Sequence, residues 1–280
     1  MTTTASANFR TEFEPLVKQA YQQGSKLMGT VRTRNNANAR TVSFPKIGKG
    51  LASLRIPGAT LTPMNAVQTA VTVTIQDYDA TDYSYVEDLE KLAFDEKAEL
   101  AKVAGMAAGR KVDQLIIDAM AASAYATQIA ISEGGANTSL NLEKLTAAAK
   151  LLNANGVPME GRHLAITADA LSAALRVATL TSADYNQMRA LMSGEIDTYM
   201  GFKWHMIETR TEGGLPLATT NQRNCFAWHE SAVGYASNGG IKSAVDWIPQ
   251  MASWQIRSYF SGGAVSIDTD GIIDVLVYEA

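Results

Sequence analysis

The chain has 280 residues, of which 46% are hydrophobic and 19% are charged, and its formal net charge at neutral pH is -4. This length and apolar content can bury a sizeable core, as one elaborate domain or two smaller ones. The overall charge gives no sign of a nucleic-acid-binding protein. A single cysteine, Cys225, excludes an intrachain disulfide and suits a reducing compartment. We also expect neither a signal peptide nor a membrane-spanning segment, because Asp118 and other polar residues interrupt the most apolar stretch.

The charges are unevenly distributed along the chain. Residues 1–60 contain nine Lys or Arg against two Glu, whereas residues 61–160 contain seven basic and fourteen acidic side chains. For any single residue, a solvated surface charge is the better interpretation. For a block of this size, attraction between oppositely charged parts of neighbouring copies of the chain is an alternative interpretation.

The first eighty residues are predicted to form an arm followed by a long two-stranded excursion. In the arm, residues 1–40, Pro15 suits the start of a short helix and Gly24 its end. The segments TVSFPKIGKG and QTAVTVTIQDYDA alternate in steps of two and flank a loop rich in glycine and proline. The excursion, residues 41–80, has little apolar content to fold around, so we expect it to need a partner surface.

The next segment predicts a long helix. Ser84 and Glu87 match a capping box, and apolar residues then recur at helical spacing without a proline up to Pro158. The pattern allows a helix of about 35–40 residues, or roughly 55–60 Å. The alternatives are a coiled coil or two helices broken at Gly105 or Gly109.

Helices and strands alternate in the rest of the chain. Asn141 suits the N-cap of a helix that ends near Gly156, and further helices are expected over about 168–177 and 183–192. The segments HLAIT, GFKWHMIE and NCFAW are predicted strands. Near the C-terminus, Asp270 and Gly271 suit a hairpin turn within VSIDTDGIIDVLV. The predicted fold class is therefore mixed α+β.

No residue pattern predicts catalysis, a cofactor or a metal. Cys225 and His229 are four residues apart, which would bring a thiol and a base together only on a helix, and the run reads as a strand. The three histidines have no metal-ligand spacing. Asp268 and Asp270 imitate part of a calcium loop, but its first and twelfth positions are Ser266 and Val277. A buried structural cysteine and a plain turn explain these residues.

The order of these elements resembles the Hong Kong 97 capsid fold of tailed-phage major capsid proteins. The runs TVTIQDYDATDYSYVEDLEKLAFD, GRHLAITADALSAAL, TSADYNQMRALMSGEIDTYMGFKWHMIET and SYFSGGAVSIDTDGIIDVLV are similar to successive parts of that fold. The resemblance implies an N-terminal arm at residues 1–40, an E-loop at 41–80, a spine helix at 81–133, an A-domain at 134–240 and C-terminal P-domain strands at 241–280.

The resemblance also implies what the chain does and what it meets. It implies an icosahedral shell of pentamers and hexamers around a phage genome, assembled in the bacterial cytoplasm with a separate scaffolding protein and a portal protein, and with cement proteins as an optional addition. A bacterial compartment shell of the encapsulin type and, less probably, a small α+β hydrolase are the alternatives. None of these alternatives predicts a membrane partner.

Two groups of charged residues are candidates for contacts in such a shell. E-loop cations are expected to pair with acidic residues at the start of a neighbour's spine helix, so that their reversal weakens assembly at low salt. The candidates for this intersubunit contact are Lys46, Lys49, Arg55, Glu87, Asp88, Glu90, Asp95, Glu96 and Glu99. Three arm cations, Arg32, Arg34 and Arg40, are expected to face packaged double-stranded DNA and to neutralise its phosphates without sequence preference.

Overall fold

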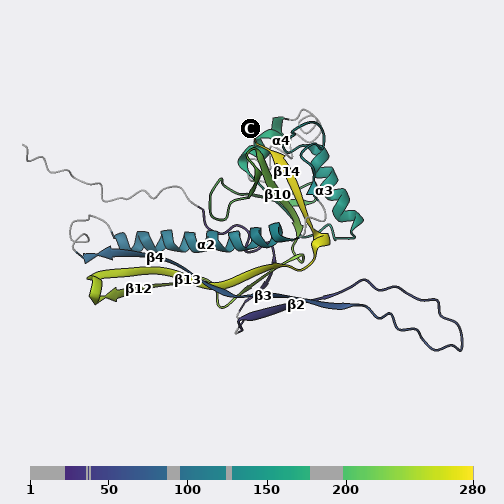
Figure 1. The fold of residues 1–280 in the computed structure, drawn as a ribbon, viewed down its shortest axis with the longest axis horizontal. Helices are drawn as coiled ribbons and strands as arrows, with labels where there is room; N and C mark the ends of the chain where they lie inside the picture. The colour runs from purple at the N-terminus through teal and green to yellow at the C-terminus, as the bar shows by residue number, and fades with distance from the viewer. Residues whose placement is uncertain are drawn as a thin grey trace, which may run out of the picture.

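A computed structural model describes residues 23–35, 37, 39–86, 95–123, 128–176 and 198–279. Within these residues the chain combines α-helices with three β-sheets, which confirms the predicted mixed α+β class. Figure 1 shows an elongated part, formed by a long helix on a narrow sheet, and a more compact part beside it. A two-stranded hairpin extends away from both.

The elongated sheet is built around one long strand, β13 (Ser253–Ser266). Ten residues of β4 (Gln76–Tyr85) pair antiparallel with its first part, and β12 (Lys242–Ile248) pairs with the same part on the other side. Further along, β11 (Val233–Ser237) pairs with β13, and β1 (Arg32–Arg34) runs parallel to β11. Segments from the start, middle and end of the chain therefore share one sheet.

The long helix is α2 (Glu96–Ala122), which lies along this sheet and has 27 residues. Its N-cap is Asp95, whose side chain accepts a hydrogen bond from the backbone N–H of Ala98. Ser84 itself belongs to β4 and its hydroxyl donates to Glu96 Oε2 at 2.5 Å, while Val86, two residues further on, is helical. The predicted helix start near Ser84 therefore agrees with Val86 within the usual uncertainty of a helix end. Residues 87–94 lie outside the described part, so a continuous helix from there into α2 stays a prediction.

The same helix is not broken at its two glycines, so the predicted alternative of two helices divided there is wrong. Gly105 has open space where a Cβ would stand. At Gly109 a Cβ would lie 2.8 Å from the backbone nitrogen of Ser25, so the glycine lets residues 24–25 lie directly against the helix.

The compact part contains the second sheet and two helices. Strand β10 (Gln222–His229) is central and pairs antiparallel with β14 (Ile272–Tyr278) and β6 (Arg162–Ile166). The remaining strands are β5 (Gln128–Ile129), β7 (Thr198–Tyr199), β8 (Phe202–Met206) and β9 (Leu217–Thr219). The segments HLAIT, GFKWHMIE and NCFAW are thus confirmed as strands. The helices are α3 (Leu142–Ala154) and α4 (Ala168–Arg176). The predicted N-cap of α3 is confirmed, because Asn141 Oδ1 accepts a hydrogen bond from the backbone N–H of Lys144 at 2.8 Å.

The predicted hairpin at Asp270 and Gly271 is wrong. These residues belong to a short 3-10 turn, η2 (Thr269–Gly271), and the strands on either side of it, β13 and β14, lie in different sheets. The turn is fixed by the carboxylate of Asp268, which accepts the backbone N–H of Asp270 at 3.1 Å. The C-terminal strand therefore completes the compact sheet, since its apolar residues are buried there beside β10.

The excursion is confirmed as a two-stranded antiparallel hairpin of β2 (Thr41–Ile47) and β3 (Gln68–Thr74). The base of the hairpin packs against the elongated sheet of its own chain. Val42, Phe44 and Val73 are buried there against residues of β11 and the end of β13. A partner surface on a neighbouring copy stays a prediction for the rest of the excursion. The expected arm helix near Pro15 and the expected helix over about 183–192 lie outside the described residues. Among the helices described, none is long and apolar enough to cross a membrane.

The two helix glycines give a matched stability test. We expect Gly109→Ala to lower the free energy of unfolding by about 1–3 kcal/mol, because the new methyl group meets the Ser25 backbone. Gly105→Ala should raise it by about 0.5–1 kcal/mol, because it adds helix propensity in open space. Urea unfolding of the unassembled chain measures both. Equal effects of the two substitutions would show that the contact with residue 25 is absent in solution.

Candidate assembly surfaces

Residues 48–67 form an exposed loop at the tip of the β2–β3 hairpin. Figure 1 shows this loop extending beyond the hairpin, away from both sheets. Its apolar side chains are between 61% and 91% exposed, namely Leu51, Leu54, Ile56, Leu61, Met64 and Val67. A monomeric protein rarely leaves so many large apolar side chains together in water, so this loop is a candidate contact surface. Its apolar residues were not singled out from the sequence, although leucine and isoleucine among glycine and proline were the available signal.

The base of this loop is tied to its own chain. Lys46 forms an ion pair with Asp268 at 2.7 Å, and Lys49 Nζ donates to the backbone oxygen of Asn155 at 3.3 Å. Two of the three predicted E-loop cations therefore have partners within the chain. The third, Arg55, is exposed in the loop and has no ion-pair partner among the described residues.

The predicted acidic candidates are distributed around the start of α2. Asp95 is its N-cap, Glu96 accepts the hydroxyl of Ser84, and Glu99 lies 2.7 Å from Lys102 Nζ. The other three, Glu87, Asp88 and Glu90, lie outside the described residues. Pairing of these carboxylates with a neighbour's loop stays a prediction.

The three predicted genome-facing cations lie near the base of the hairpin. The guanidinium of Arg32 lies 5.9 Å from the ring centroid of Phe44, and Arg34 Nη1 donates to the backbone oxygen of Ser43 at 3.4 Å. Arg40 lines an open pocket of about 910 Å³ where β3 passes into β4. Arg32 and Arg34 therefore lie on β1, and Arg40 lies in the segment that connects β1 to β2.

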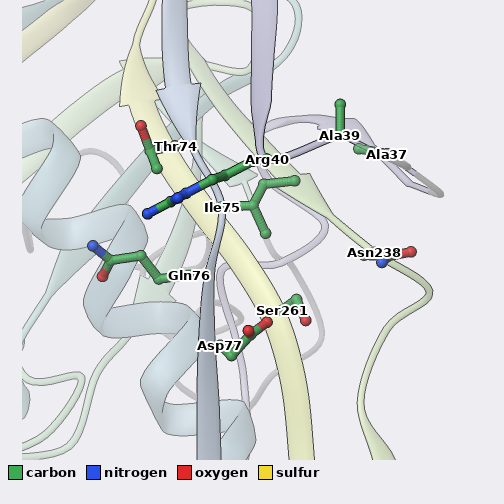
Figure 2. Close-up of a pocket in the computed structure, with 9 residues that line it drawn as sticks. All are labelled: Ala37, Ala39, Arg40, Thr74, Ile75, Gln76, Asp77, Asn238 and Ser261. Atoms are coloured by element: carbon green, nitrogen blue, oxygen red, sulfur yellow. The ribbon is translucent and has the colours of Figure 1, made fainter.

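The pocket lies where several elements meet, since its lining residues come from the segment before β2, the β3–β4 connection, β13 and the residue after β11. Figure 2 shows Arg40 extending across it toward Thr74, with Asp77 and Ser261 at the other end. Arg40 and Asp77 are its charged lining residues, and the other lining residues are neutral. Its lining holds no cysteine or histidine that could act as a nucleophile or general base.

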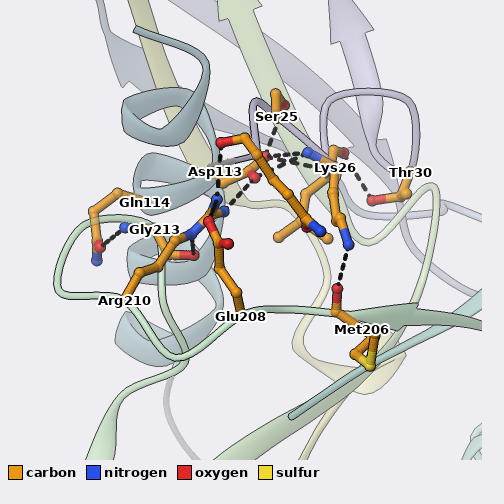
Figure 3. A network of polar contacts seen from close by, with 11 residues as sticks. Ser25, Lys26, Thr30, Asp113, Gln114, Met206, Glu208, Arg210 and Gly213 are labelled. Carbon is orange, nitrogen blue, oxygen red and sulfur yellow. Dashed lines mark hydrogen bonds and ion pairs between the residues drawn. The ribbon is translucent and has the colours of Figure 1, made fainter. Parts of the chain in front are cut away.

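A buried carboxylate fixes the segment before β1 against α2. Asp113, on α2, accepts hydrogen bonds from Ser25 Oγ at 2.7 Å, Lys26 N at 2.9 Å and Leu27 N at 3.0 Å (Figure 3). Arg210 Nη2 reaches the same carboxylate at 2.8 Å, which makes a nearly buried ion pair. Four donors on one carboxylate compensate the cost of burying its charge. This centre was not predicted, although a charged residue beside Val112 and Ile116 on an apolar helix face was a signal for it.

Arg210 connects this centre to the loop that follows β8. Its Nη1 lies 3.1 Å from Glu208 Oε1, and its Nε donates to the backbone oxygen of Gly213. Lys26 Nζ also reaches the backbone oxygen of Met206 at 2.7 Å (Figure 3). The polar network therefore joins residues 25–27, α2 and residues 206–213.

The predicted structural cysteine is confirmed as a buried residue. Cys225 is fully buried in β10, and burial raises the pKa of its thiol from 9.0 to about 12. His229 bonds through Nδ1 to Ser231 Oγ at 2.8 Å. A neutral thiol without solvent access is a poor nucleophile, so this pair does not form a hydrolase site.

The other two histidines form a pair in the compact sheet. His163 Nδ1 lies 2.9 Å from His205 Nε2, and the ring of Trp228 stacks on His163 with centroids 5.6 Å apart. Burial lowers the pKa of His163. In the part of the chain that the structure describes, no group of three or more His, Cys, Asp or Glu is arranged to hold a metal ion.

Comparison with known proteins identifies the family. Residues 5–279 match the model of a family described as phage capsid protein. The chain therefore belongs to the phage capsid protein family, and it is a major capsid protein that forms the shell of the virion. The search of curated proteins gave no significant match. The family match supports the capsid interpretation over the compartment shell and the hydrolase that the sequence left open.

Solved capsid structures share the fold. The capsid of cyanophage P-SCSP1u is 18% identical with a TM-score of 0.72, and the match covers 98% of this chain and 93% of that one. The head of Helicobacter pylori bacteriophage KHP40 is 10% identical with a TM-score of 0.73, covering 96% and 95%. The capsid of a native GTA particle is 14% identical with a TM-score of 0.67, covering 98% and 96%. The predicted capsid fold is thus confirmed, whereas its division into named domains stays a prediction.

The buried ion pair gives the second prediction. We expect Asp113→Asn to lower the free energy of unfolding by about 1.5–3 kcal/mol, because a neutral amide replaces a carboxylate that accepts four donors. Glu208→Gln is the matched control, since Glu208 contacts the same arginine but its side chain is 32% exposed. Its effect should stay below about 1 kcal/mol. Urea unfolding measures both, and a control effect as large as that of Asp113→Asn would contradict the assignment.

The buried thiol gives the third prediction. At pH 8 the folded chain should not react with a thiol reagent, because Cys225 is buried and its pKa is raised to about 12. In denaturant one thiol per chain should react. The measurement is labelling followed by mass spectrometry, with His229→Gln as a variant that should behave like the parent. Rapid labelling of the folded parent that is slowed in His229→Gln would instead indicate an activated cysteine.

Proposed function

We propose that copies of this capsid protein join into pentamers and hexamers by laying residues 48–67 of each copy on the surface of a neighbour. The observation that carries the proposal is the exposed apolar set of this loop, whose six large side chains are 61–91% exposed among the residues that the structure describes. Burial stabilises by about 25 cal/mol for each Å² of apolar surface removed from water. In a closed symmetric shell every copy offers its neighbour the same surface, so each loop gains the same cover.

Charge contributes to this contact through Arg55. It lies in the loop among the apolar residues, and its guanidinium is exposed and can meet carboxylates of the segment that precedes a neighbour's α2, where Glu87, Asp88 and Glu90 are the candidates. Each exposed pair contributes only about 0.2–1 kcal/mol. Repetition in every copy of the shell makes a term of this size matter.

The inner surface of the shell is proposed to meet the genome through Arg32, Arg34 and Arg40. These cations are grouped at the base of the hairpin, and the side chains of Arg32 and Arg34 contact neutral groups. Their charges remain available to DNA phosphates, and such contacts are independent of base sequence. A separate scaffolding protein and a portal protein, with cement proteins as an optional addition, complete the proposed set of partners. Assembly is proposed to take place in the host bacterial cytoplasm.

We also propose that the chain has no catalytic role of its own. The thiol is buried with a raised pKa, and the lining of the open pocket at Arg40 holds no cysteine or histidine. Trp228 serves packing, since its side chain is buried and its Nε1 donates to the backbone oxygen of Thr30 at 3.0 Å.

The loop contact gives the fourth prediction. We expect the double substitution Leu51→Glu and Leu54→Glu to lower the yield of closed shells in the host by about tenfold or more, because charges replace apolar side chains that are buried only on assembly. Ser53→Glu and Thr60→Glu place the same charges on polar positions of the loop and form the matched control. Shell yield is measured by sedimentation and electron microscopy, and urea unfolding checks that the isolated chain is unchanged.

The charged residue is tested in the same assay. Arg55→Glu should lower the shell yield at low ionic strength and have less effect at high salt, because screening weakens exposed pairs. This variant avoids Lys46, whose reversal would also break the ion pair with Asp268. Normal shells from the double leucine variant would refute the loop contact, and a salt-independent Arg55→Glu would refute its electrostatic part.

A further inference from the structure

Strand β12 (Lys242–Ile248) forms one edge of the elongated sheet. β13 pairs with it along its whole length on one side, and among the residues described no strand pairs with its other side. Figure 1 places it at the end of the molecule opposite the loop 48–67. A free edge presents unpaired backbone N–H and C=O groups, which can pair with another strand.

The side chains of this edge are exposed and include apolar ones. Val245 is 45% exposed and Trp247 is 42% exposed, and Ile241, directly before the strand, is 38% exposed. Trp247 also lies against Trp254 of β13, with ring centroids 5.3 Å apart, so its position is held from within the sheet. Exposed aromatic and β-branched residues on an unpaired edge favour pairing with a further strand.

Two opposite charges stand symmetrically on the strand. Lys242 and Asp246 are both exposed, lie two residues on either side of Ala244, and have no ion-pair partner within the part of the chain that the structure describes. Charges of one sign on an edge would repel the same edge of a second copy. This arrangement of a lysine and an aspartate instead attracts a second copy that runs antiparallel to the first.

One register satisfies all of these side chains together. When a two-fold axis perpendicular to the sheet passes through Ala244, Lys242 of each copy lies opposite Asp246 of the other. The same register places Ile241 opposite Trp247 and Ser243 opposite Val245, so the apolar residues also meet. The two neighbouring symmetric registers place Lys242 opposite Ala244 or Ile248, and neither forms a charge pair.

We propose that the β12 strands of two copies pair antiparallel about a two-fold axis at Ala244, which joins the two elongated sheets into one across a subunit contact of the shell. The contact rests on the shell assembly proposed above but uses the opposite end of the molecule from the loop 48–67. A pair of seven-residue strands buries less than the roughly 1,000 Å² that a stable interface needs. We therefore expect it to form within the shell, where many weak contacts act together, and not between isolated chains.

Charge exchange is the first test. Lys242→Glu alone and Asp246→Lys alone should each lower the yield of closed shells by about tenfold, because each two-fold contact exchanges two opposite-charge pairs for two like-charge pairs. The double variant Lys242→Glu with Asp246→Lys restores opposite charges in the proposed register, so it should recover the parent yield. Two losses without recovery in the double variant would show that the edge binds a different protein, and this result would overturn the proposal.

Cross-linking is the second test and reports position directly. In the proposed register residue 244 faces itself, so Ala244→Cys should give a disulfide-linked dimer in mildly oxidised shells. Ser243→Cys and Val245→Cys face different residues and should give little dimer, and the native Cys225 is buried and does not interfere. Closed shells of Ala244→Cys without the dimer would overturn the β12 contact and leave the loop contact standing. If shells are lost in the leucine variants of the loop but not in the β12 charge variants, the loop contact is supported and the β12 contact is not.

Discussion

The pairing of β4 with β13 is the interaction on which the rest of the structure depends. Ten residue pairs join residues 76–85 to residues 253–262 and align two segments that are far apart in sequence. The helix α2 follows β4 and lies on the sheet that this pairing creates. The hairpin leaves the sheet where β3 passes into β4, so its direction is set by the same ladder. Because β4 occupies one side of β13, β12 pairs with the other side. Among the described residues no further strand pairs with β12, so its outer edge is free.

The apolar surface of the chain is divided between stability and assembly. The fully buried side chains concentrate in the compact sheet and under α2, where Trp228, Phe226 and Ile116 are inaccessible to water. The large exposed ones lie mainly at the two far ends, on residues 48–67 and around β12. An isolated chain can be stable without covering the second group, because the core is complete without it. In the proposed shell these exposed ends become buried against neighbouring copies, so that their burial stabilises the assembly and not the single chain.

Several elements could be predicted because their determinants are local. Asn141 caps α3 as expected, the alternation in TVSFPKI and QTAVTVT gives the hairpin, and Cys225 is buried as its apolar run indicated. The capping pattern at Ser84 indicated the helical residue Val86, but not that Ser84 itself pairs with β13, because the partner strand of that ladder lies far away in the sequence. The turn at Asp270 was wrong for a related reason, since turn chemistry does not show whether the flanking strands pair with each other.

The sequence by itself determined the class of fold, the family and the kind of residues on each element, because periodicity and helix caps depend on residues close together in sequence and the order of segments follows the chain. Only the tertiary structure decided which charges are already paired, such as Lys46 with Asp268 and Asp113 with Arg210. It also decided which apolar residues remain in water. Both depend on distances between residues more than ninety positions apart in sequence, and these distances are fixed by how the two sheets pack, which no local pattern records.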